Sequence, residues 1–143
     1  MIINKRHTGL VVNNLSLSIK FYESLGLKVW NRQIEKGNFI SKVVGIKNVE
    51  IETAKLKIQD GSLLELLEYK SPKKKNVNYI YPSNRHGCSH VSFTVKDIDK
   101  ISKLIVSIGG SIVNLPQVSE NGTHKVMYCH DIDGIIVELV QEL

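Results

Sequence analysis

The sequence has few cysteines and no long apolar run. Its two cysteines, Cys88 and Cys129, form neither a CxxC pair nor a zinc-finger spacing, so we predict reduced, buried packing residues inside strands. Residues 1–5 lack the apolar stretch of a signal peptide, and no segment has the length of a membrane span. These absences predict a protein in the cytoplasm with no membrane partner.

The positive charge of the chain is modest. The formal net charge is +5, and the densest group of lysines, Lys70 with Lys73, Lys74 and Lys75, lies beside Pro72 without interleaved aromatic residues. Such a group is more typical of a solvated loop than of a nucleic-acid or anionic-ligand site. We therefore predict no nucleic-acid partner. The 42% content of hydrophobic residues predicts a globular fold with a buried core.

The two halves of the chain repeat each other. The segment RHTGLVV contains His7, and the segment GCSHVSFTV contains His90, 83 residues further on. The same step carries Asn14, a predicted helix N-cap, onto Asp97, and carries Gly26, a predicted C-terminal glycine, onto Gly109. The sequence therefore predicts an internal duplication.

Hydrophobic periodicity predicts a strand, a helix and three strands in each half. The first half has predicted strands at 2–12, 27–35, 49–58 and 62–69, a helix between Asn14 and Gly26, and a short helix within the loop 36–48. The second has predicted strands at 87–95, 111–118, 125–130 and 134–141 and a helix between Asp97 and Gly109. Asp60-Gly61 and Asp133-Gly134 are the predicted turns before the last strands.

These elements predict an α+β fold made of two βαβββ modules, residues 1–71 and 86–143. The segment 72–85, which is rich in lysine and asparagine and has no apolar periodicity, is the predicted linker. We expect the two modules to form one compact domain. Its curved mixed sheet would surround one cavity, and its helices would lie outside.

Strand alternation places two carboxylates on faces with aliphatic neighbours. Glu65 lies between Leu63 and Leu67, and Glu138 lies between Ile136 and Val140. A buried carboxylate needs a cation, a hydrogen-bonding partner or a proton to offset its desolvation.

A divalent ion would satisfy both carboxylates together with one histidine from each half. His7, Glu65, His90 and Glu138 would then be two nitrogen and two oxygen ligands of a first-row metal. Taken singly, each histidine is more typical of a hydrogen-bonded strand residue, and each glutamate of an exposed edge residue. Their matched placement in duplicated halves favours the metal site.

Several motifs in this sequence resemble the vicinal oxygen chelate superfamily, which includes glyoxalase I, methylmalonyl-CoA epimerase, extradiol dioxygenases and antibiotic-resistance proteins. They are FYESLGL, LLELLEY, HVSFTV and DIDGIIVEL. By position, the metal ligands of the family fall on His7, Glu65, His90 and Glu138. Bacterial glyoxalase I is similar in the order His, Glu, His, Glu, whereas methylmalonyl-type epimerases commonly have Gln at the position of Glu65.

The resemblance implies a cofactor, partners and a reaction. The cofactor is one divalent ion per site (Ni, Zn, Co, Mn or Fe), the substrate is a small molecule with vicinal oxygens, and the assembly is a homodimer. We expect a lyase or isomerase, of the glyoxalase I or epimerase kind, that abstracts a proton beside the chelated oxygens. By resemblance to glyoxalase I, Glu138 is the first choice of catalytic base and Glu65 the second.

Two other functions stay open for this chain. An extradiol-type dioxygenase would use three protein ligands, so the fourth, Glu65, counts against it. A binding protein that sequesters a small molecule, as resistance proteins do, typically lacks the full quartet. The sequence also departs from the family at Ile132, where a proline is usual, and it has no arginine cluster for glutathione.

The remaining candidates receive ordinary structural roles. Glu68 alternates away from Glu65 and is expected to be a solvated or helix-side charge. Three histidines are expected at the surface: His86, His124 and His130. Three aromatic residues either line an apolar substrate cavity or pack in the core: Trp30, Phe39 and Tyr128.

Overall fold

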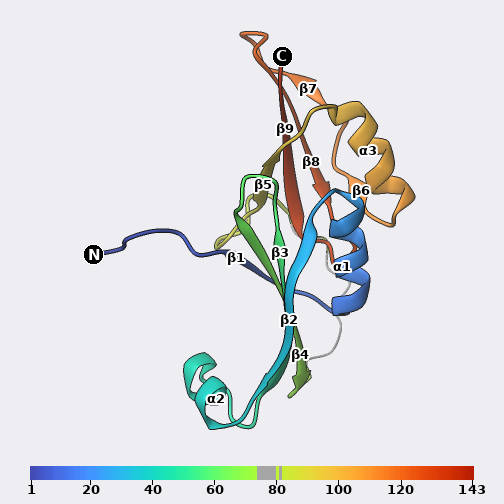
Figure 1. The fold of residues 1–143 in the computed structure, drawn as a ribbon. Helices are drawn as coiled ribbons and strands as arrows, with labels where there is room; N and C mark the ends of the chain where they lie inside the picture. The colour runs from blue at the N-terminus through green and yellow to red at the C-terminus, as the bar shows by residue number, and fades with distance from the viewer. Residues whose placement is uncertain (74–79, 81) are drawn as a thin grey trace. The chain divides into compact units, whose positions relative to one another are not determined.

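A computed structural model describes residues 1–73, 80 and 82–143 (Figure 1). The chain divides into two compact units, Met1–Val77 (unit 1) and Asn78–Leu143 (unit 2), and their boundary lies within the predicted linker. Lys74 and Lys75, part of the predicted solvated loop, fall outside the described residues. In the part of the chain that the structure describes, no helix is long and apolar enough to cross a membrane.

Unit 1 is a four-stranded sheet with two helices. The sheet order is β1-β4-β3-β2, in which β1 runs parallel to β4 and the other pairs are antiparallel. In chain order the elements are β1 (Thr8–Val11), α1 (Leu15–Ser24), β2 (Lys28–Lys36), α2 (Asn38–Val44), β3 (Glu50–Lys57) and β4 (Leu63–Ser71). The short helix α2 confirms the prediction of a helix in the loop 36–48.

Unit 2 repeats this order with shorter outer strands. Its sheet order is β5-β9-β8-β6, with β5 parallel to β9 and with β7 also paired to β8. The elements are β5 (Val91–Thr94), α3 (Ile98–Ser107), β6 (Ser111–Ile112), β7 (Gln117–Val118), β8 (His124–His130) and β9 (Ile136–Glu142). The α+β class and the strand-helix-strands order of both halves are therefore confirmed.

One face of each sheet is covered by a helix, and the other carries the candidate ligands. In unit 1, α1 packs against β2, β3 and β4, and Leu15 and Tyr22 of α1 are completely buried. Strand alternation places Leu64 and Leu66 on this face and Glu65 on the opposite one. In unit 2, α3 packs against β6, β8 and β9 and buries Ile98 and Ile105. The site residues are thus separated from each helix by the sheet itself.

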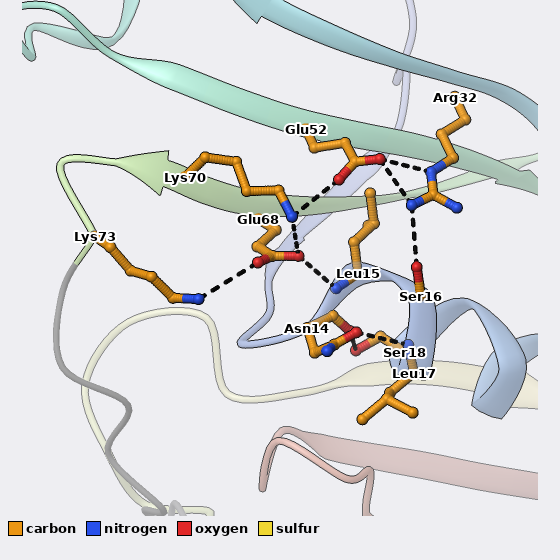
Figure 2. A network of polar contacts seen from close by, with 10 residues as sticks. All are labelled: Asn14, Leu15, Ser16, Leu17, Ser18, Arg32, Glu52, Glu68, Lys70 and Lys73. Atoms are coloured by element: carbon orange, nitrogen blue, oxygen red, sulfur yellow. Dashed lines mark hydrogen bonds and ion pairs between the residues drawn. The ribbon is translucent and has the colours of Figure 1, made fainter.

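The duplication extends to the start of each helix, where a last-strand side chain accepts a backbone hydrogen bond. In unit 1 the N–H of Leu15 donates to Glu68 Oε2 at 2.9 Å (Figure 2). In unit 2 the N–H of Ile98 donates to Gln141 Oε1 at 2.8 Å. Asn14 and Asp97 cap these helices as predicted, because their side chains accept from backbone N–H groups three residues on. Each last strand therefore anchors its helix at the first turn.

Glu68 belongs to a network of polar contacts on the helix side of unit 1 (Figure 2). It is buried, with 6% of its surface exposed, and its carboxylate contacts Lys70 Nζ at 2.8 Å and Lys73 Nζ at 3.6 Å. Lys70 also contacts Glu52, which binds Arg32 at 2.7 Å. Of the two alternatives predicted for Glu68, a solvated or a helix-side charge, the structure shows the helix-side one. The carboxylate is buried and contacts Lys70 and Lys73, two of the lysines that were predicted to lie in a solvated loop.

The network lowers the pKa of its carboxyl groups. Burial raises the pKa of Glu68, but the Leu15 N–H and the charges of Lys70 and Lys73 outweigh it, so the pKa lies below its ordinary value. The pKa of Glu52 is also lowered, chiefly by its hydrogen bond to Lys70 and, against some desolvation, by Arg32. Both carboxylates are therefore more stable as anions in the folded chain than in the unfolded chain.

We expect Glu68→Gln to lower the free energy of unfolding by about 1–3 kcal/mol at about pH 7, because it removes the buried negative charge that accepts from the Leu15 N–H and contacts Lys70 and Lys73. A group whose folded pKa is depressed stabilises the fold above its unfolded pKa, and this contribution is lost as pH falls through the folded pKa. The difference between parent and variant should thus shrink from about pH 7 to about pH 3. Urea unfolding across this range measures it.

Glu23→Gln is the matched control, because Glu23 is an exposed residue of α1 and should change stability little at any pH. A Glu68→Gln variant as stable as the parent, or a difference that did not vary with pH, would contradict the role given to this carboxylate.

Three strand predictions need correction. The predicted strand 87–95 is only β5, whose four residues pair with four residues of β9. The predicted strand 2–12 is only β1, because its parallel partner β4 begins at Leu63 and offers no backbone groups to residues further upstream. The predicted strand 111–118 is two short strands, β6 and β7, that pair with different parts of β8. Pro116 lies between them, and it has no N–H with which to continue the ladder.

Candidate functional site

The first candidate pair, His7 and Glu65, lies on the face of unit 1 that is opposite α1. His7 directly precedes β1, and Gly9 two residues later is aligned with Glu65 on β4. His7 Nε2 lies 3.0 Å from Glu65 Oε2, and the side chain of Glu65 is only 11% exposed. The parallel pairing of β1 with β4 thus brings together two residues that are 58 positions apart in the sequence.

The second candidate pair, His90 and Glu138, is arranged in the same way in unit 2. His90 directly precedes β5, and Ser92 is aligned with Glu138 on β9. His90 Nε2 lies 3.6 Å from Glu138 Oε2, and the side chain of Glu138 is 22% exposed. The second pair is therefore looser and more open than the first.

Each glutamate also has a neighbour on the adjacent antiparallel strand: Lys55, which the sequence analysis did not single out, and Tyr128, which it placed either in an apolar substrate cavity or in the core. Lys55 of β3 is aligned with Glu65, and its Nζ lies 3.6 Å from Glu65 Oε1. Tyr128 of β8 is aligned with Glu138, and its hydroxyl oxygen lies 3.4 Å from His90 Nδ1. Only strand register reveals that a cation occupies this position in unit 1 and a phenol in unit 2.

Tyr128 is a neutral hydrogen-bonding group. Desolvation, followed by the negative charge of Glu138, raises the pKa of the Tyr128 phenol above its ordinary value. Its ring lies beside that of His90, with a centroid distance of 5.1 Å. The hydroxyl oxygens of Ser89, at 3.2 Å, and of Tyr128, at 3.4 Å, both lie at the Nδ1 edge of the imidazole, and its Nε2 edge faces Glu138.

Cys88 and His130 depart from their predicted environments. Cys88 is exposed and precedes β5, so the prediction of a buried strand cysteine is wrong for it and right for Cys129. Burial, with a further effect from Asp131, raises the pKa of the Cys129 thiol to about 12, which leaves it unreactive. His130 is buried at the end of β8, aligned with Ile136, rather than at the surface.

The other predicted surface histidines, His86 and His124, are exposed as expected. Trp30 and Phe39 are not core residues, because they are 63% and 80% exposed. Trp30 lies at the bulge of β2, an edge strand with a neighbour on one side only, and Phe39 lies in the short helix that follows it.

The donor atoms of the two pairs suit a divalent first-row ion. Each pair presents an imidazole nitrogen and a carboxylate oxygen on one face of its sheet. Among residues 1–73, 80 and 82–143, no group of three or more His, Cys, Asp or Glu side chains is gathered for a metal. The described residues thus hold two separate His-Glu pairs, one in each unit.

Comparisons of this chain with known proteins point to one family. A family model described as Glyoxalase/Bleomycin resistance protein/Dioxygenase superfamily matches residues 6–139. A lactoylglutathione lyase of Neisseria meningitidis is 27% identical over 138 residues, which are 95% of this chain and 88% of that protein. A probable lactoylglutathione lyase of Synechocystis is 26% identical over 94% of this chain and 92% of its own length.

Solved structures show the same architecture. A glyoxalase family protein from Bacillus cereus superposes with a TM-score of 0.92 at 27% identity, covering 100% of this chain and 96% of that one. A fosfomycin resistance protein from Listeria monocytogenes, complexed with Mn(II) and sulfate, has a TM-score of 0.64 at 15% identity, with 100% and 95% of the two chains covered. At that identity the second likeness concerns the fold alone.

Proposed function

The chain belongs to the Glyoxalase/Bleomycin resistance protein/Dioxygenase superfamily, and from this premise we propose that it is a divalent-metal-dependent lyase or isomerase. The reaction is proton abstraction from a carbon next to two neighbouring substrate oxygens. The observation that carries the proposal is the repeated His-Glu pair, His7 with Glu65 and His90 with Glu138, one in each unit. The proposal also includes a homodimer in the cytoplasm.

In the proposed site the four side chains hold one ion, which is Ni, Zn, Co, Mn or Fe. The Listeria fosfomycin resistance protein, whose structure is a complex with Mn(II), supports a divalent ion in this fold. When bound, the ion would polarise the two substrate oxygens as a Lewis acid and so acidify the adjacent C–H bond. Tyr128 supports the role of His90, because its phenol oxygen can accept a hydrogen bond from Nδ1 and leave Nε2 to serve as ligand.

Glu138 is the proposed base, and its surroundings support this choice over Glu65. Glu65 Oε2 lies 3.0 Å from His7 Nε2, and Oε1 faces the Lys55 ammonium at 3.6 Å, so this carboxylate has a neighbouring group on each side. Glu138 contacts His90 at the longer distance of 3.6 Å, and its side chain is twice as exposed as that of Glu65. Glu138 can therefore turn toward a substrate proton at a smaller loss of contacts.

The substrate need not carry glutathione. The sequence has three arginines, and Arg32 is committed to Glu52 and to Ser16 on the helix side of unit 1. The relatives named lactoylglutathione lyase favour lactoyl compounds as first probes. Lactoylglutathione and L-lactate both carry vicinal oxygens; the first is a thioester that carries the glutathione peptide, and the second is a free carboxylate without it, so exchange in lactate would show that the peptide is not required.

The test is isotope exchange in D₂O with the metal-loaded protein. We expect deuterium to enter at the carbon that bears the hydroxyl group in at least one of the two probes, with no uptake of O₂. Mass spectrometry follows the exchange, and an oxygen electrode follows O₂ with catechol added as a dioxygenase probe. Oxygen-dependent loss of catechol would instead establish the ring-opening dioxygenase, and tight binding of the probes with neither change would establish a sequestering protein.

A further inference from the structure

Lys55 is a partly buried lysine on the face of the unit 1 sheet that also carries Glu65. Its side chain is 25% exposed, and its Nζ lies 3.6 Å from Glu65 Oε1. This distance is longer than that of a hydrogen bond, and within the described part of the chain the Lys55 ammonium makes no hydrogen bond. A lysine ammonium has three N–H donors, so Lys55 can bind a further acceptor.

The fold itself does not require a cation at this position. Tyr128 occupies the corresponding place in unit 2, aligned with Glu138 on the neighbouring strand just as Lys55 is aligned with Glu65. An uncharged side chain can therefore occupy this position beside a glutamate. His7 already contacts the other oxygen of Glu65, so a structural need for Lys55 as its partner is weak.

The surroundings of Lys55 on this face are polar. Asn31 of β2 is aligned with Lys55, and its Nδ2 donates to Gln33 Oε1 at 3.2 Å. Gln33 in turn donates to Glu35 Oε1 at 2.7 Å. Two amide side chains, followed by the carboxylate of Glu35, thus run along the edge strand β2 beside Lys55, and such polar groups suit a hydrogen-bonding ligand better than an apolar one.

From this arrangement we propose that Lys55 is a specificity-determining residue that binds the acidic group of a small carboxylate substrate. The inference rests on the proposed function. In the proposed site a divalent ion would balance the charges of Glu65 and Glu138, and imidazole ligands bind a metal as uncharged groups. Lys55 then leaves one positive charge at the site, which a 2-hydroxy or 2-oxo acid with a single carboxylate would neutralise.

The test uses the full chain loaded with Mn(II), with glycolate and its uncharged amide, glycolamide, as probes. Calorimetry should show that Lys55→Met weakens glycolate binding by about tenfold, the scale of one charge-assisted hydrogen bond, while glycolamide binding changes by less than about twofold. Lys55→Gln should behave in the same way and serves if the Met variant does not fold. Lys57→Met is the matched control, because Lys57 is exposed on the same face of β3, and it should leave both probes unaffected.

The outcomes separate this inference from the proposed function. Mn(II) content is measured independently by electron paramagnetic resonance. Three results, each obtained with normal uptake of Mn(II), would overturn the role of Lys55 alone. They are no glycolate binding by the parent chain, unchanged glycolate binding in the Lys55 variants, and equal losses for glycolate and glycolamide. Failure of the parent chain to take up Mn(II) would overturn the proposed function and this inference with it.

Discussion

Replacing either His7 or His90 with Ala is expected to abolish stoichiometric uptake of a divalent metal. Each histidine supplies the only imidazole of its pair, and its Nε2 already lies within 3.0 or 3.6 Å of the partner carboxylate. Loss of a direct ligand should weaken metal binding by more than the roughly 10–100-fold that follows loss of a residue merely supporting a ligand. Elemental analysis of the purified variants measures the effect.

The control for this pair of variants is His124→Ala, which removes an exposed histidine from the beginning of β8. It should bind metal like the parent chain. Circular dichroism should show that all three variants keep the parent fold, because His7 and His90 precede their strands and do not pack against the buried faces of α1 and α3. Unchanged metal content in both site variants would refute the ligand assignment.

Glu138→Gln is expected to reduce proton exchange by on the order of 10²-fold or more while metal binding falls much less. The amide keeps a carbonyl oxygen that can act as a ligand, but it cannot accept the substrate proton as a carboxylate does. The measurement is the rate of deuterium incorporation into the probe that exchanges with the parent chain, with metal content determined on the same samples.

Glu65→Gln is the matched variant, because Glu65 holds the corresponding place in unit 1. If Glu138 is the base, Glu65→Gln should keep more of the exchange activity than Glu138→Gln. Exchange at the parent rate in Glu138→Gln together with loss of exchange in Glu65→Gln would assign the base to the first unit instead.

Much of each unit could be predicted from local sequence patterns. The helices follow from apolar spacing between a capping residue and a glycine, and Gly26 and Gly109 indeed have the positive φ angles, 99° and 96°, that favour glycine at such ends. Alternation in β4 correctly separated Glu65 from the residues that face α1. These features depend on residues close together in the chain, so one sequence is sufficient to find them.

The contacts that sequence reasoning missed depend on which residues face each other across strands. Lys55 and Tyr128 become neighbours of Glu65 and Glu138 only through the register of β3 with β4 and of β8 with β9. The burial of His130 has the same cause, since alignment with Ile136 places it inside the sheet rather than in the turn that follows. A lone polar residue in a strand gives no sign of its cross-strand partner.

The central claim is that the two His-Glu pairs hold one ion together, and counting metal ions tests it most directly. The full chain is purified without chelators, its metal content is determined by elemental analysis, and Mn(II) is then titrated into the metal-free protein. The account predicts one divalent ion per chain, lost on replacement of a histidine in either unit. No bound metal, or two ions per chain with each histidine variant losing only one of them, would contradict it.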